Sequence, residues 1–106
     1  MELLFNTDNQ IDATEAMEAR ANEIVDSALG RFEHHLTRIE LHLADENSPQ
    51  KGGSADIRCT MEARPEGLRP LTVTHHDANP DAAMRGAAKK LQRALDNEFG
   101  KLDARR

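Results

Sequence analysis

Three successive segments of this chain, residues 36–45, 54–64 and 71–75, alternate apolar and polar side chains, and this pattern constrains the fold more than any other feature. Side chains of a β-strand point alternately to its two faces, so each segment is predicted to be a strand with one buried face. The apolar positions of shared parity are Ile39, Leu41 and Leu43, then Ala55, Ile57, Cys59, Met61 and Ala63, then Leu71 and Val73. We expect the three strands to be neighbours in one antiparallel sheet.

Turn-forming residues separate these strands. The stretch ENSPQKGGS at residues 46–54 is predicted to be a polar loop, and Pro65-Glu66-Gly67 is predicted to be a tight turn. Near the start of the chain, residues 2–6 read as a further short strand.

The sequence predicts one amphipathic helix before the three strands and another after them. The first begins at a capping box of Asp12 and Glu15, and Gly30 is its stop signal. Its apolar stripe is formed by Met17, Ala21, Ile24, Val25, Ala28, Leu29 and Phe32. The second is expected to start with Asn79 as N-cap and Pro80 as first residue. Gly100 could end it, although Leu102 continues the stripe.

The predicted order is therefore β-α-β-β-β-α. Two helices that each bury one stripe need a common apolar surface, and a four-stranded sheet with one apolar face supplies it. We expect an α+β two-layer sandwich, a single domain over residues 1–106, with both helices on one face of the sheet. The first strand is joined to the second through a helix, so the two are expected to be parallel if adjacent.

Charge is distributed unevenly along this acidic chain, whose net charge is −5. Residues 1–50 contain three arginines against eleven acids, whereas residues 85–106 contain seven bases against three acids. An asymmetry of this kind indicates either contact with a polyanion at the basic end or association between opposite ends of two molecules.

The basic charge is concentrated on one arc of the second helix. Its candidate binding residues are Arg85, Lys89, Lys90, Arg93 and Lys101. The spacing of Arg85, Lys89 and Arg93 predicts a ridge about 12 Å long. A phosphate backbone would relieve the repulsion within the ridge and release counterions. The alternative is a solvated face that complements the helix dipole. Aromatic residues are absent from this face, which favours phosphate and shape readout of folded RNA over stacking on single strands.

Other functional chemistry finds little support. A lone cysteine, Cys59, excludes an internal disulfide, and neither a signal peptide nor a membrane-spanning run is visible, so we expect a soluble cytoplasmic protein. The histidines lack the spacing of a metal site, and Cys59 is predicted to be a small core residue. We expect neither an enzyme nor a protein with a metal, a cofactor or a small-molecule substrate.

Three stretches resemble the ribosome hibernation promoting factor family, also called the ribosome-associated inhibitor A family. They are GRFEHHLTRIELHLADEN (30–47), DIRCTMEARPEGLRPLTVTHHDANP (56–80) and DAAMRGAAKKLQRALDNEFGKL (81–102). The resemblance implies the same β-α-β-β-β-α fold, similar to double-stranded-RNA-binding domains. It also implies binding to the small ribosomal subunit at the decoding region, where the protein would occlude mRNA and tRNA and so inhibit translation under stress.

Carried over to this chain, the resemblance assigns ribosomal RNA contacts to Arg85, Lys89, Lys90, Arg93 and Lys101. Two features depart from the family pattern: Asp81 stands where the family has a Tyr, and the first helix is acidic. The chain resembles a short family member without the additional domain that dimerises ribosomes, and it is expected to be monomeric when free.

A protein–protein regulatory module is the alternative function. In that case the acidic first helix of one copy would meet the basic last helix of another molecule, without ribosome binding.

Overall fold

A computed structural model describes residues 1–46 and 56–104, and the side chains up to Lys101. Its elements are β1 (Glu2–Thr7), α1 (Glu15–Leu29), the 3₁₀ helix η1 (Gly30–His35), β2 (Leu36–Asp45), β3 (Ile57–Pro65), β4 (Leu71–Asp77) and α2 (Pro80–Ala104). The predicted α+β order is confirmed. The predicted loop at 46–54, apart from Glu46, and Ala55 lie outside the described residues.

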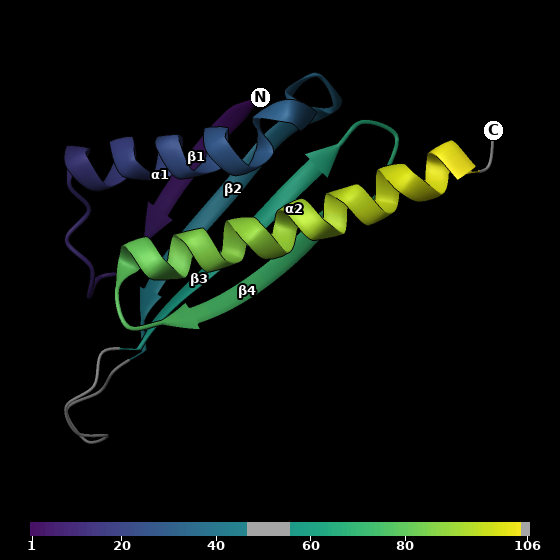
Figure 1. Ribbon diagram of the computed structural model, residues 1–106. Helices are drawn as coiled ribbons and strands as arrows, with labels where there is room; N and C mark the ends of the chain where they lie inside the picture. Colours follow the sequence, from purple (N-terminus) through teal and green to yellow (C-terminus); the bar gives the residue numbers. More distant parts are fainter. Residues whose placement is uncertain (47–55, 105–106) are drawn as a thin grey trace.

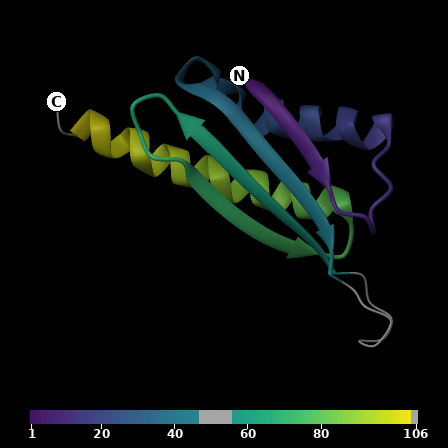
Figure 2. The ribbon, with the colours of Figure 1, turned by 180° about the vertical axis from the view of Figure 1, so that it is seen from behind.

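The four strands form one sheet in the order β1-β2-β3-β4. Strand β1 is parallel to β2, whereas β2–β3 and β3–β4 are antiparallel, as the lengths of the connections predicted. Both helices lie on one face, with α2 across β3 and β4 and α1 beside it (Figure 1). None of the described helices lies on the opposite face of the sheet (Figure 2).

The apolar core lies between the sheet and the helices. The inward parity predicted for β2 and β3 is confirmed, since Ile39, Leu41, Leu43, Cys59 and Met61 are fully buried. The helical stripes cover them with the buried side chains of Ala21, Ile24, Val25 and Leu29 from α1 and of Met84, Ala87, Ala88, Leu91 and Leu95 from α2. Burial of these side chains excludes water from the sheet face and fixes the position of α2.

The beginning of α1 differs from its prediction. The N-cap is Thr14, whose hydroxyl accepts a hydrogen bond from the Met17 amide at 3.1 Å, so the capping box at Asp12 is wrong. Residues 8–14 connect the end of β1 to the start of α1. There the Asp8 carboxylate accepts hydrogen bonds from the amides of Ile11 and, on β2, Asp45. This turn delays the helix by a few residues.

Gly30 ends α1 as predicted, whereas the ends of α2 and β4 differ from their predictions. Gly30 has φ −58° and leads directly into η1, so it ends α1 without the left-handed conformation of a glycine cap. Helix α2 continues past Gly100, as the spacing of Leu102 indicated. Strand β4 extends beyond His75 to Asp77. Gly67 does adopt a left-handed φ of 74°, which confirms the turn between β3 and β4.

Gly86, in the middle of α2, allows a close approach between the helix and β4. A Cβ atom at this position would overlap the imidazole ring of His75, which lies on the helix-facing side of the strand. The helix-propensity cost of a mid-helix glycine is therefore offset by closer packing of α2 on the sheet edge.

Candidate nucleic-acid interface

Helix α2 presents the candidate residues because its opposite face is anchored. Asn79 caps the helix as predicted, since its side-chain oxygen accepts a hydrogen bond from the Ala82 amide at 2.8 Å. The apolar stripe is buried along the helix from Ala83 to Leu95. The basic residues lie on the remaining arc and are all exposed to solvent.

Lys89 and Arg93 lie one helical turn apart on this exposed arc. Within the described part of the chain, neither side chain has a hydrogen bond or an ion pair. Two adjacent cations of like sign repel each other by a few tenths of a kcal/mol. Arg85, Lys90 and Lys101 each have a hydrogen-bond or ion-pair partner, so Lys89 and Arg93 are the cations of α2 without one among the described side chains.

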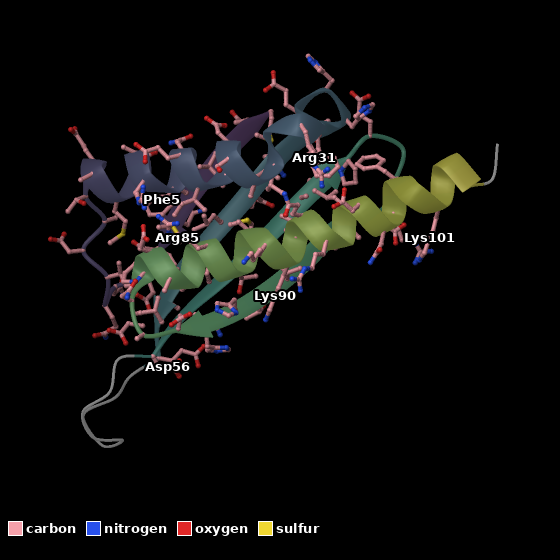
Figure 3. All side chains as sticks on the ribbon, viewed as in Figure 1. Phe5, Arg31, Asp56, Arg85, Lys90 and Lys101 are labelled. Carbon is pink, nitrogen blue, oxygen red and sulfur yellow. The ribbon has the colours of Figure 1, made fainter. Side chains whose placement is uncertain are left out.

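Arg85 has a different environment, although the sequence placed it on the same ridge. Its Nε atom donates a hydrogen bond to Asp81 Oδ2 at 2.7 Å. It lies on the side of α2 that faces α1 (Figure 3). The other oxygen of Asp81 accepts a hydrogen bond from Arg20 Nε on α1, also at 2.7 Å. These two guanidinium groups, Arg20 first, lower the pKa of Asp81, and Asp81 together with Glu23 raises the pKa of Arg20.

Lys90 and Lys101 emerge on the other side of α2 (Figure 3). Lys90 Nζ donates a hydrogen bond of 2.8 Å to the Thr74 carbonyl oxygen of the edge strand β4. Lys101 Nζ lies 3.6 Å from Glu98 Oε1. The five predicted residues thus form three groups. Arg85 lies on the side of α2 that faces α1, and Lys90 and Lys101 lie on the side of the sheet edge. Lys89 and Arg93 lie between them, and we call this exposed pair the crest.

Two acids of α2 are neutralised from the first half of the chain. Arg31 of η1 contacts both oxygens of Asp96, at 2.6 and 2.5 Å, and Arg20 of α1 contacts Asp81. Both pairs therefore join an arginine from the acidic half to an aspartate of the basic helix. As a result, the positive charge of Lys89 and Arg93 remains uncompensated by these acids.

Arg20 is a candidate residue that sequence reasoning missed. It lines a groove of about 620 Å³ between α1 and α2, together with Arg85 and Lys89. In the sequence, Arg20 is the single basic residue between Glu15 and Leu29, surrounded by acids. That exception on an acidic helix was the available indication of an inter-helix role.

The other residues that could carry chemistry are Cys59 and the histidines. Cys59 is fully buried, and burial raises the pKa of its thiol to about 12, so the thiolate is disfavoured. Among the described residues, no three His, Cys, Asp or Glu side chains are grouped in a way that could hold a metal ion. No helix in the part of the chain that the structure covers is long and apolar enough to cross a membrane.

A sequence profile of the family described as sigma 54 modulation protein / S30EA ribosomal protein matches residues 6–103. The chain belongs to this family. The resemblance noted in the sequence is thereby confirmed, and membership places the chain among ribosome-associated modulation proteins. Among curated proteins, none matches the sequence significantly.

The fold is shared with solved structures, of which two are described by their likeness to the chain. The N-terminal domain of Protein Y from Thermus thermophilus is 14% identical, with a TM-score of 0.72 over 92% of this chain and 98% of that chain. A ribosomal subunit interface protein from Coxiella burnetii is 11% identical, with a TM-score of 0.70 over 94% of this chain and 99% of that one. At these identities the likeness establishes the two-layer fold and not the residues of a binding site.

Proposed function

We propose that this protein binds the small ribosomal subunit at its decoding region and occludes mRNA and tRNA there, without catalysing a reaction. The observation that carries the proposal is the pair Lys89 and Arg93, which are exposed, without partners among the described residues, on a helix fixed by a buried stripe. Family membership supports a ribosomal partner, as does the likeness to a ribosomal subunit interface protein of Coxiella burnetii. A phosphate backbone is the polyanion that such a crest fits.

Arg85, Lys90 and Lys101 belong to the proposed RNA-binding set although each has a protein partner. The exposed ion pairs of Arg85 and Lys101 contribute only about 0–1 kcal/mol each, and Lys90 bonds to a backbone carbonyl. Exchanging these exposed partners for a phosphate therefore costs little. We infer that Lys89 and Arg93 make the first contacts and that the flanking cations join them. The free protein is proposed to be a cytoplasmic monomer.

The test is co-sedimentation with purified small subunits across a salt series. Phosphate contacts release counterions, so retention should fall steeply as salt rises. The crest variant is Lys89→Glu with Arg93→Glu. The control is Arg69→Glu, which changes an exposed cation of the β3–β4 turn that has no ion pair among the described residues. Loss of binding in the crest variant but not in Arg69→Glu is expected, whereas equal binding by all three proteins would contradict the proposed face.

Occlusion is tested separately from binding. Saturating protein should prevent labelled mRNA and initiator tRNA from binding to small subunits. If both still bind while the protein co-sediments, the protein binds elsewhere on the subunit and the occlusion mechanism is wrong.

One observation keeps the protein–protein alternative testable. The carboxylates of Glu15, Glu18 and Asp26 on α1 have no ion pair among the residues that the structure describes. A dimer that forms at low salt and dissociates at high salt, combined with no small-subunit binding, would favour self-association of opposed helices.

A further inference from the structure

The groove between α1 and α2 brings together cations from both halves of the chain. Arg20 lines it from α1, and Arg85 and Lys89 line it from α2. Glu23, Ser27 and Gln92 complete much of the polar wall. Its volume of about 620 Å³ is open to solvent and is ample for a phosphate group with part of its sugar. Three cationic side chains thus converge on a concave surface rather than on a convex helix crest.

Asp81 shows that an anion can be held between the two arginines. Each of its oxygens accepts a hydrogen bond from a different guanidinium group, Arg20 and Arg85, at 2.7 Å. A phosphate oxygen pair has the same donor requirement and carries comparable charge, and guanidinium groups bind both anions well. The carboxylate occupies part of the donor capacity that a phosphate would use.

We propose that this groove is a subsite for a phosphate of the RNA backbone, held by Arg20, Arg85 and Lys89, and that Asp81 weakens it by competing for both arginines. The proposal rests on the proposed function and adds to it a residue of the acidic first helix. The groove is continuous with the crest because Lys89 belongs to both.

The physical basis is the donor count of the two arginines. A guanidinium group has five N–H donors, and Arg85 commits Nε to Asp81 in its one ion pair among the described residues. Arg20 commits Nε to Asp81 and Nη1 to Glu23. Both arginines therefore retain donors for a phosphate, while Lys89 supplies an exposed charge one turn away.

The decisive comparison is Arg20→Gln against Arg31→Gln. Each change removes an arginine that pairs with an aspartate of α2, but Arg20 lines the groove and Arg31 does not. Arg20→Gln should weaken binding to purified small subunits by roughly 3–10-fold and reduce the slope of log affinity against log salt by about 1. Arg31→Gln unpairs Asp96 but removes no donor from the groove, so it should weaken binding by no more than about twofold. Equal effects of the two variants would overturn the groove.

The role of Asp81 is tested by Asp81→Asn alone and in the Arg20→Gln background. The single change should tighten binding by a few-fold, about 3-fold or more, because both arginines gain donors for phosphate. The gain should be smaller when Arg20 is already Gln, as coupled residues require. Weaker or unchanged binding by Asp81→Asn would overturn the competition. Thermal unfolding of each variant checks that the changes in affinity occur in folded protein.

A second probe separates failure of the groove from failure of the ribosomal proposal. The probe is a short duplex RNA, whose binding to the protein at low salt can be measured without ribosomes. If Arg20 is required for duplex binding while small subunits do not bind, the groove stands and the ribosomal target is wrong. If neither probe binds, both are wrong. Polyglutamate is the comparison ligand. If it binds more tightly than RNA and its binding requires Arg20, the occupant of the groove is an acidic protein segment and not RNA.

Discussion

The open face of the sheet and the exposed crest of α2 are both rich in charge, but they present it differently. On the sheet, Arg64 lies 3.6 Å from Glu40 and 2.9 Å from Glu62. Arg58 lies 3.0 Å from Glu46 at the far end of β3. On α2, Lys89 and Arg93 have no such neighbours within the described residues. The strands place opposite charges side by side, whereas the helix places like charges one turn apart.

This difference indicates which face can attract a polyanion. Paired charges produce fields that cancel over a short distance, so the open sheet face offers little net potential to RNA. The crest retains its potential because Lys89 and Arg93 have no ion pair among the described residues, while the nearby Asp81 and Asp96 are paired with Arg20 and Arg31. Position within the fold, rather than the number of basic residues, therefore distinguishes the candidate interface.

The largest expected effect is a loss of stability when a buried side chain beneath the crest is truncated. Leu91 is fully buried beneath it, and Leu91→Ala should lower the free energy of unfolding by about 3 kcal/mol. Asn97→Ala, on the exposed side of the same helix, should change it by less than about 0.5 kcal/mol. Chemical denaturation measures both. If folded Leu91→Ala bound RNA much more weakly, the crest would depend on core packing in addition to surface charge.

Charge reversal on the crest should have the next largest effect. Lys89→Glu with Arg93→Glu should weaken small-subunit binding on the order of 100-fold at physiological salt, since attraction to phosphate becomes repulsion. On the sheet, Arg38→Glu with Arg64→Glu makes the same formal change and should cost less than about 5-fold. Filter binding or sedimentation compares them. A larger loss from the sheet variant would mean that RNA binds the open face.

Unpairing the sheet charges should produce a smaller change in the opposite direction. Glu40→Gln with Glu62→Gln leaves Arg38 and Arg64 without their carboxylate partners. We expect a loss of stability within about 1 kcal/mol and a gain of a few-fold, roughly 2–5-fold, in non-specific RNA binding at low salt. If the variant binds duplex RNA as the unchanged protein does, the ion pairs of the sheet are not what limits RNA binding to this face.

The smallest expected effect is the acid dependence of one ion pair. The Arg64 hydrogen bond lowers the pKa of Glu62 below 4.5, so its contribution to stability is present above that pH and is lost as pH falls through the lowered pKa. Glu62→Gln should therefore flatten the loss of stability below about pH 4.5 while leaving the curve shape at neutral pH unchanged. Urea denaturation at several pH values measures this. An identical acid limb in both proteins would exclude Glu62 as a contributor.

Much of the fold could be predicted because its information is local. Alternating residues in β2 and β3 and the helical spacing in α2 identified the buried faces. Boundaries were less accessible: Asp12 and Thr14 are both good helix caps, and the hydrogen bonds of Asp8 to residues as distant as Asp45 favour the later start. The candidate cations of α2 could be identified by spacing, but their division among three directions could not.

The sequence by itself determined the order of elements, the apolar core and the basic arc of the last helix, because each depends on the periodicity of neighbouring residues. The tertiary structure decided which charged residues of that helix are paired with distant parts of the chain. Arg20 meets Asp81 and Arg31 meets Asp96 across 61 and 65 residues of chain, and Lys90 finds the Thr74 carbonyl of the edge strand. Those contacts depend on how two helices lie on a sheet, and no local pattern encodes that arrangement.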